Sequence, residues 1–115
     1  RTGQAIGAVM KSYSVLVLLA LSGCATVYDL DNRMPDARYV SQKPVPVLAQ
    51  CIHGGMRSLG NAQIEQGAET TWITLTTQTG NPAARVTIRP TQTGSVALVR
   101  QTINYSLGPA IQRCL

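Results

Sequence analysis

Residues 70–77, with the sequence TTWITLTT, decide the fold, because they are dense in β-branched residues and alternate between two kinds of side chain. Ile73 and Leu75 point to one side of an extended chain, and Trp72 and Thr74 point to the other. This pattern predicts a strand with one face against a hydrophobic core. A strand of this kind needs neighbours, and the residues that follow supply them.

Two further runs repeat the alternation. Residues 84–89 place apolar side chains between arginine and threonine, and residues 95–104 do so again after a turn at Thr93-Gly94. Three consecutive strands joined by short turns predict an antiparallel three-stranded meander. Residues 62–66 fit a short additional strand ahead of it.

A helix is predicted over residues 46–59. Pro46 suits a first helical turn, and Gly60-Asn61 is a stop signal. Gly54 and Gly55 each weaken a helix by about 1 kcal/mol relative to alanine, so we expect close packing against another backbone as compensation. The apolar residues of the predicted helix recur at spacings of three and four and form one face, which contains Val47, Leu48, Cys51, Ile52, Gly55 and Leu59.

A second, shorter helix is predicted at the C-terminal end, where Gly108-Pro109 ends the strands and apolar residues recur at helical spacing. Residues 46–115 therefore predict an α+β domain of order α-β-β-β-α. It is an antiparallel three-stranded meander with two helices on one face. Helices packed side by side on that face bring Cys51 near Cys114.

The N-terminal part has the features of an export signal. Lys11 precedes the apolar run 15–21, which suits a secretory signal core, whereas a transmembrane helix needs roughly 20 apolar residues. The sequence Leu21-Ser22-Gly23-Cys24 resembles the lipobox of bacterial lipoprotein precursors. The resemblance implies cleavage before Cys24 and a diacylglycerol on its sulfur, but it identifies a processing class and no functional family. An ordinary cleaved signal or a buried helix is the alternative.

The resemblance also implies a location. Two or three acyl chains anchor a protein stably, and Ala25, in place of aspartate, implies export to the outer membrane by enterobacterial sorting, facing the periplasm. The expected organisation is a signal peptide over residues 1–23, a lipid-anchored flexible tether over residues 24–45 and the α+β domain over residues 46–115. The tether is predicted because prolines and aspartates interrupt any period there.

Cys51 and Cys114 form an even pair once Cys24 is assigned to the lipid. In an oxidising compartment such a pair predicts a disulfide. A bond that closes a loop of about 60 residues stabilises the fold by about 4 kcal/mol in the chain-entropy model. A metal site or a reactive thiol is the alternative, but His53 is the only histidine and no CxxC spacing occurs.

The charge does not indicate nucleic-acid binding. Without the signal the chain carries eight basic and five acidic residues, a net charge of +3, and the basic residues are scattered. Weak attraction to anionic lipid headgroups is more natural for an envelope protein.

No residue set indicates catalysis, a metal or a cofactor. Cys51 and His53 lie two positions apart on the predicted helix and so point to different sides. Asp29 and Asp31 lack the spacing of a calcium loop, and hydrolase motifs such as GxSxG, HExxH and SxxK are absent. Glu65 and Glu69 could be proposed as a general acid and a general base, but no neighbouring residue would make one carboxyl group the acid and the other the base. We therefore expect a protein that is not an enzyme.

Binding is the remaining class of function. If the strands pair as hairpins, Trp72 shares the open face of the sheet with three arginines, Arg85, Arg89 and Arg100. This face is either a solvated polar surface or a docking surface, since Trp and Arg are enriched in binding hot spots. Tyr28 and Tyr39 in the tether are spacers, domain contacts or partner-binding residues.

We expect a structural or assembly accessory that binds an envelope protein. In size and α+β content the chain is similar to small lipoproteins that assist barrel assembly, although their helices precede the strands and here one helix follows. The alternative is a binder or sensor of an envelope lipid or a peptidoglycan fragment.

Overall fold

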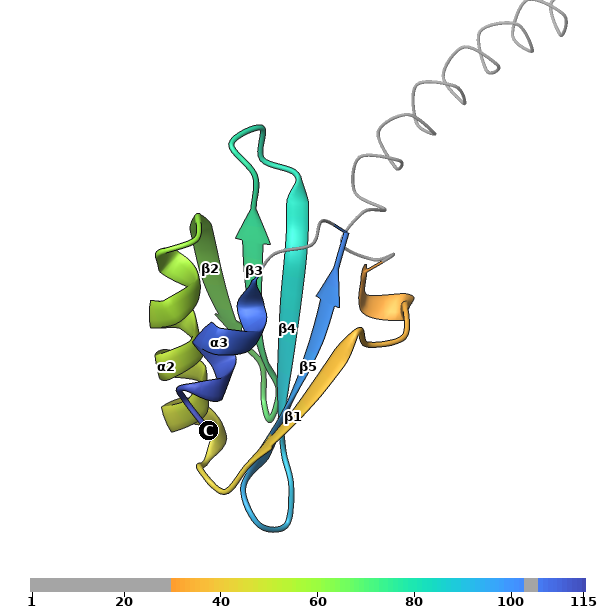
Figure 1. Cartoon of the computed structure of the whole chain (residues 1–115). Helices are drawn as coiled ribbons and strands as arrows, with labels where there is room; N and C mark the ends of the chain where they lie inside the picture. The colour runs from red at the N-terminus through yellow and green to blue at the C-terminus, as the bar shows by residue number, and fades with distance from the viewer. Residues whose placement is uncertain (1–29, 103–105) are drawn as a thin grey trace, which may run out of the picture.

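The computed structural model describes residues 30–102 and 106–115. The predicted signal peptide, the lipidation site Cys24, its neighbour Ala25 and Tyr28 lie outside the described residues. The elements are, in chain order, β1 (Ala37–Ser41), α2 (Val45–Arg57), β2 (Asn61–Gln66), β3 (Thr71–Thr76), β4 (Pro82–Pro90), β5 (Ser95–Gln101) and α3 (Leu107–Gln112) (Figure 1).

The strands form one antiparallel sheet in the order β1-β5-β4-β3-β2. The α+β class is as predicted, and β3, β4 and β5 are the predicted meander. The predicted number of three strands is wrong, because the sheet has five. The short strand expected over residues 62–66 is present as β2, and β1 adds a further strand at the opposite edge.

β1 lies inside the segment that the sequence predicted as a flexible tether over residues 24–45. It pairs with β5 in a register that places Tyr39 opposite Ala97 and Ala37 opposite Val99. The five residues of β1, which lies between Pro35 and Pro44, are too few to show a period, so the strand depends on its partner for its conformation. Residues 37–41 are therefore part of the sheet and not of a tether.

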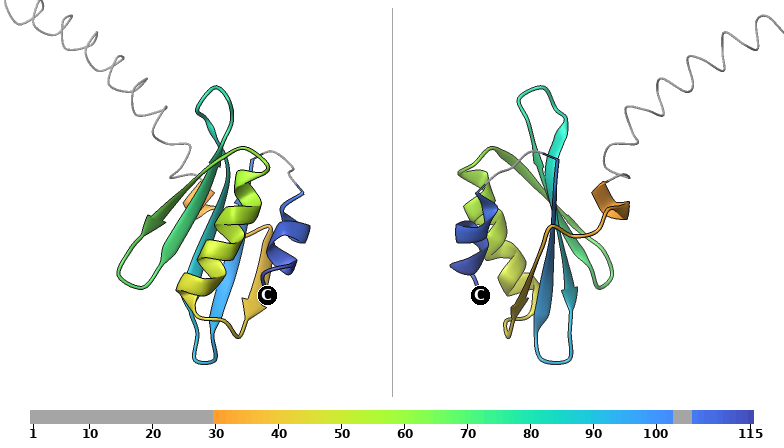
Figure 2. Two further views of the ribbon diagram at one scale, coloured as in Figure 1. Left: turned by 90° about the vertical axis from the view of Figure 1, so that its left-hand side faces the viewer. Right: turned by 45° about the vertical axis from the view of Figure 1, so that its right-hand side comes forward.

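α2 and α3 cover the same face of the sheet (Figure 2). The predicted number of two helices is wrong, because residues 30–32 are helical as well. The buried stripe of α2 differs from the predicted one, since Val47 and Leu59 are exposed. Cys51 is exposed too, which corrects its placement on the buried face. The residues that α2 buries are Leu48, Ala49, Ile52 and Met56.

The core lies between this helix layer and alternate residues of the strands. In β3, Ile73 and Leu75 are fully buried, as predicted, and Val86 and Ile88 of β4 continue the same face. The other core residues are Ala84, Ala97, Val99, Leu107, Ile111 and Cys114, with those of α2 named above. Thus one face of the sheet is covered by α2 and α3, and a single helical turn at residues 30–32 lies on the other side.

The two helices approach closely at Gly55. A Cβ added there would lie 3.2 Å from the Cβ of Ala110, whereas one added at Gly54 would meet nothing within 4 Å. The expected compensation for a weakened helix therefore holds for Gly55 alone.

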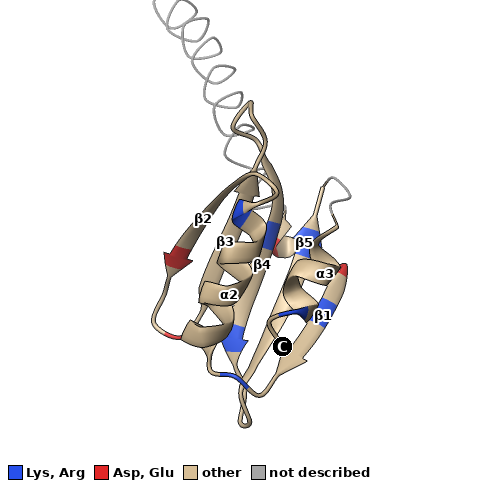
Figure 3. Ribbon diagram, turned by 60° about the vertical axis from the view of Figure 1, so that its left-hand side comes forward, with Lys and Arg blue, Asp and Glu red and all other residues tan. Residues whose placement is uncertain are grey.

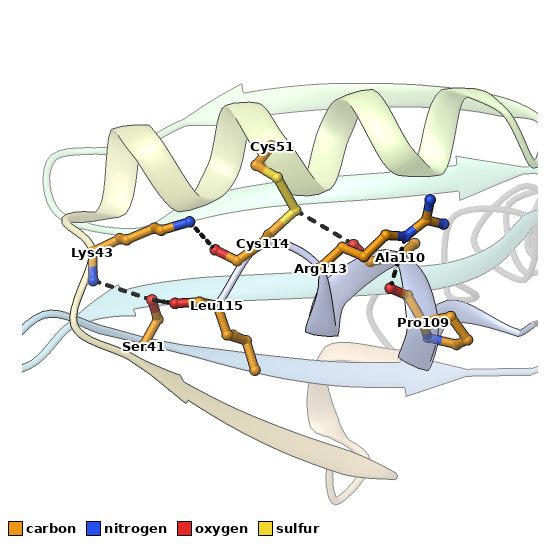
Figure 4. The surroundings of a disulfide bond; sticks show 8 residues. All are labelled: Ser41, Lys43, Cys51, Pro109, Ala110, Arg113, Cys114 and Leu115. Carbon is orange, nitrogen blue, oxygen red and sulfur yellow. Dashed lines mark hydrogen bonds between the residues drawn. A yellow bond between two sulfur atoms is a disulfide. The ribbon is translucent and has the colours of Figure 1, made fainter.

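A disulfide joins α2 to the C-terminal end of the domain (Figure 4). Cys51 and Cys114, separated by 63 positions, have Cα atoms 5.7 Å apart, as the pairing of the cysteines predicted. Lys43 Nζ donates a hydrogen bond of 2.7 Å to the Cys114 carbonyl, and Ser41 Oγ donates one of 3.3 Å to the Leu115 carbonyl. Cys114 Sγ lies 3.4 Å from the Ala110 carbonyl oxygen, which is a packing contact because a disulfide sulfur carries no hydrogen. The end of the chain is thus fastened to both α2 and the β1–α2 junction.

Loss of this disulfide is expected to destabilise the domain by about 4 kcal/mol, which corresponds to a fall in melting temperature of roughly 15 to 30 °C. The test is thermal unfolding of the detergent-extracted full chain, followed by circular dichroism, for the Cys51→Ser/Cys114→Ala double variant. Reductant should lower the melting temperature of the parent chain similarly. Gln50→Ser, at the exposed neighbouring position of α2, should leave it unchanged, and equal melting of all three proteins would contradict the prediction.

Candidate binding surface

The face of the sheet opposite the helices is called here the outer face. The strand register aligns Trp72 with Thr87, Thr87 with Leu98, and Leu98 with Arg38 in one row across the outer face. The next row contains Thr74, Arg85 and Arg100. Because alternate residues share a face, Arg89 lies on the outer face as well. Trp72 and the three arginines singled out from the sequence therefore share one face, as expected.

Residues 30–36, called here the docked segment, cross one end of the outer face (Figure 2). The Arg100 Nε–H donates a hydrogen bond of 2.7 Å to the Arg33 carbonyl. The Asp36 carboxylate accepts one of 2.8 Å from the Gln101 N–H, and the Asp36 N–H donates one of 2.7 Å to the Val99 carbonyl. Leu30 has no exposed surface. The docked segment is therefore fixed to the sheet by both polar and apolar contacts.

Arg85 is buried beneath this segment, with 8% of its surface exposed. Its Nε lies 2.8 Å from Asp31 Oδ1, an ion pair without hydrogen-bond geometry, and its Nη1 donates a hydrogen bond of 3.1 Å to Thr74 Oγ1. Its guanidinium carbon lies 5.7 Å from the centroid of the Trp72 ring, within the range of a cation–π contact. These contacts offset part of the cost of burying the charge, although the Nε–H itself has no hydrogen-bond acceptor.

The three arginines proposed from the sequence as a binding face thus have different positions. Arg85 and Arg100 are buried and engaged with the docked segment and the sheet, whereas Arg89 is exposed. The sequence did not show this difference, because the partners of Arg85 and Arg100 in the docked segment, Asp31 and the Arg33 carbonyl, lie more than fifty residues away along the chain. Only Arg89 of the three presents its charge to solvent.

The part of the outer face that the docked segment leaves open is called here the outer-face patch. It consists of Trp72, Leu98, Val40, Arg38 and Arg89. Trp72 and Leu98 are half-buried, Val40 is 59% exposed, and both arginines are exposed. Val96 lies beneath the patch, opposite both Val40 and Arg89.

Sequence reasoning missed Arg38, Val40 and Leu98. The signal for the first two was the alternation within residues 37–41, which is short and was assigned to a tether. Tyr39 points to the other face and packs partly buried against the core, which leaves it a domain contact.

The remaining candidates for chemistry are not assembled into a site. Cys51 is in the disulfide, and His53 Nε2 lies 3.0 Å from the Ala62 carbonyl oxygen, so the two side chains have separate partners. Among residues 30–102 and 106–115, no group of His, Cys, Asp or Glu side chains is arranged to hold a metal. Glu65 is on β2 and Glu69 follows it in the loop to β3.

Two open grooves flank the ends of α2. One, of about 510 Å³, is lined by residues 59–61 and 76–79, and the other, of about 530 Å³, lies between residues 44–46, the β2–β3 turn and the β4–β5 turn. Glu69 is the one ionisable side chain that lines either groove. The outer-face patch therefore has more of the side chains typical of recognition than either groove.

Charge is dispersed over the described part of the molecule, as the sequence indicated. In the view of Figure 3, Lys and Arg occur singly on several elements. No helix within the described ranges is long and apolar enough to cross a membrane.

Comparisons of the chain with protein-family models, curated proteins and solved structures gave no match.

Replacement of Arg100 by methionine should loosen the docked segment, because it removes the charge-assisted hydrogen bond to the Arg33 carbonyl. With a loss of about 1.4 kcal/mol, trypsin should cleave after Arg33 about tenfold faster. Mass spectrometry of timed digests gives the rate. Arg89→Met, on the same face but away from the segment, is the control, and equal cleavage of both variants would argue against the assigned role of Arg100.

Proposed function

We propose that the protein is a lipid-anchored component of the bacterial envelope, at the outer membrane and facing the periplasm. It acts without catalysis, as a structural or assembly accessory, by binding another envelope protein through the outer-face patch. The observation that carries this proposal is the patch itself, an uncovered sheet surface with a tryptophan, aliphatic side chains and two exposed arginines.

The composition of the patch supports a protein partner. Trp and Arg are enriched among residues that dominate binding energy, and hot spots are surrounded by apolar contacts that exclude water. Here Trp72 and Leu98 lie in one row, and Arg38 and Arg89 flank them. The two guanidinium groups favour an acidic surface on the partner.

The scaffold beneath the patch also suits this role. Arg85 holds the Trp72 ring from one side, and the central strands are packed against the helices on their other face. Such a surface loses little conformational freedom when a partner binds, which lowers the cost of association.

The lipid anchor would act close to this surface. Five residues separate Cys24 from Leu30, and an extended chain reaches about 3.5 Å per residue, so the acylated sulfur would lie at most about 20 Å from the domain. This reach is much shorter than that of the tether of 22 residues, 24–45, which the sequence predicts. Docking of residues 30–36 supports a shorter tether, which would begin on the outer-face side.

This closeness also favours a second candidate, binding of anionic lipid headgroups by Arg38 and Arg89. Both arginines are exposed on the side of the domain where the anchor would attach. Tryptophan is common at membrane–water interfaces, where its ring lies at the level of the headgroups.

Membrane attachment is expected to depend on Cys24. Cys24→Ser removes the sulfur that would carry the diacylglycerol, and the protein should then leave the membrane fraction. Fractionation of cells, with mass spectrometry of the parent protein for acyl chains, measures this. Cys51→Ser serves as the control for loss of a cysteine and should stay membrane-bound, while an unacylated parent protein would refute the anchor.

Capture of a protein partner is expected to depend on the patch. Arg89→Glu and Leu98→Ser should each reduce recovery of a stoichiometric partner about tenfold after reversible crosslinking in intact cells. Val47→Ser is the matched control, because Val47 is an exposed aliphatic residue on α2, away from the outer face.

The lipid candidate is distinguished with the same variants. Trp72 is the only tryptophan, so its emission reports on the patch directly. A blue shift with vesicles of anionic lipid but not of zwitterionic lipid, lost in Arg89→Glu, would favour headgroup binding. Partner capture without such a shift would favour the protein partner. If neither the shift nor partner capture is observed, the assignment of the patch as a binding surface is overturned.

A further inference from the structure

β2 is the last strand on its side of the sheet, and no strand among the described residues pairs with its outer edge. Edge strands in monomeric proteins are commonly protected by lysine, proline or a bulge, because their free backbone groups can pair with another chain. The sequence of β2, Asn61–Gln66, contains no basic residue and no proline. This edge therefore has few of the usual features that prevent strand addition.

The opposite edge of the sheet, formed by β1, has more of these protective features. β1 carries Arg38 and is bounded by Pro35 and Pro44, and the chain on either side of it is fastened to other parts of the domain. These are the protective features that β2 lacks, so strand addition is favoured at β2 over β1.

The backbone groups available on β2 follow from its register with β3. The Gly67 N–H donates to the Thr70 carbonyl, and hydrogen-bonded pairs recur at every second residue, so Glu65, Gln63 and Asn61 bond to β3. The backbone groups of Ala62, Ile64 and Gln66 therefore point away from the sheet.

His53 covers part of this edge. Its Nε2 lies 3.0 Å from the carbonyl oxygen of Ala62, which agrees with the outward direction of that group. The groups of Ile64 and Gln66 and the N–H of Ala62 have no such cover from His53. An added strand can thus bond to the middle and the C-terminal part of β2 without displacing the histidine.

We propose that two copies of this chain pair through antiparallel β2 strands, about a two-fold axis at Ile64, to form a continuous ten-stranded sheet. In this register Ile64 faces Ile64 of the second copy, and Ala62 faces Gln66 of the second copy. Backbone bonds form at the axis and from each Ala62 N–H to the Gln66 carbonyl of the other copy.

The pairing of side chains across the axis favours this occupant and this register. Gln63 lies opposite Glu65 of the second copy, and Glu65 lies opposite its Gln63, so each carboxylate faces an amide. Glu65 is the one charged residue of β2, so no like charges lie directly opposite one another. The Ile64 side chains, which lie at the margin of each core, contact each other across the axis.

The symmetry also fits the rest of the molecule. A two-fold axis normal to an antiparallel sheet leaves the helices of both copies on one side and both outer faces on the other. The two docked segments therefore lie on the same side of the dimer. This agrees with attachment of both copies to one membrane, but the pairing itself does not depend on the anchor.

Position 63 provides a test in both directions. Gln63→Lys places a cation opposite Glu65 at two symmetric sites and should tighten the dimer about 2- to 30-fold, whereas Gln63→Glu should weaken it by a similar factor. Native mass spectrometry of the full chain extracted in detergent, over a range of concentrations, gives the dimer fraction. Gln50→Lys and Gln50→Glu, on exposed α2, are the matched controls for charge.

A second measurement identifies the neighbour of β2 in cells. A photo-crosslinking residue at the exposed position 66 should join two copies of this chain. Opposite shifts for the position 63 variants, with this crosslink, support the proposal. The proposal would be overturned by a monomer at all concentrations or by a dimer fraction that is the same in the parent chain and in both position 63 variants. A crosslink from position 66 only to a different protein would overturn it as well.

Discussion

The fold depends on the covalent link between α2 and the residues that directly follow α3, over one face of the sheet. α3 has only six residues, Leu107–Gln112, and a helix of that length is not stable alone in water. It stays in place because Leu107 and Ile111 are buried in the core and because Cys114 is bonded to Cys51. With α2 and α3 fixed on the same face, the opposite face of the sheet is left for other contacts.

Part of that opposite face is used by the chain itself. Arg85 and Arg100 are buried there, and a buried guanidinium is tolerated only where acceptors surround it. Thr74 and the Arg33 carbonyl are such acceptors, and Asp31 is the ion-pair partner of Arg85; Asp31 and Arg33 belong to the docked segment. The arginines thus require the segment, and the segment is held by the arginines, which explains why residues before β1 follow the sheet instead of leaving it.

Local periodicity was sufficient for most of the fold. β3, β4, β5 and α2 extend over enough residues to show alternation or helical spacing, and the cysteine pair agreed with helices on one face. β1 was missed because five residues carry a weak signal and its pairing with β5 joins segments about sixty residues apart. Cys51 was placed on the buried side because a helical face read from spacing is uncertain by about one residue, or 100° of rotation.

The candidate site was predicted only in part for the same reason. The common face of Trp72, Arg85, Arg89 and Arg100 follows from strand alternation, which is local. Which of these side chains remains open to a partner depends on where residues 30–36 lie, and that is a long-range property. A basic residue on a predicted open face is therefore weak evidence for binding until the intramolecular acceptors near it are known.

The docked segment finally limits what kind of partner can use the outer-face patch. If Cys24 is acylated, the five residues before Leu30 hold the outer-face side within about 20 Å of the lipid. If the outer-face patch also turns toward the bilayer, a large globular partner would have little space between them. The proposed function then favours a partner that is itself embedded in the membrane or lies flat on it, and whose exposed surface carries the acidic groups that Arg38 and Arg89 attract.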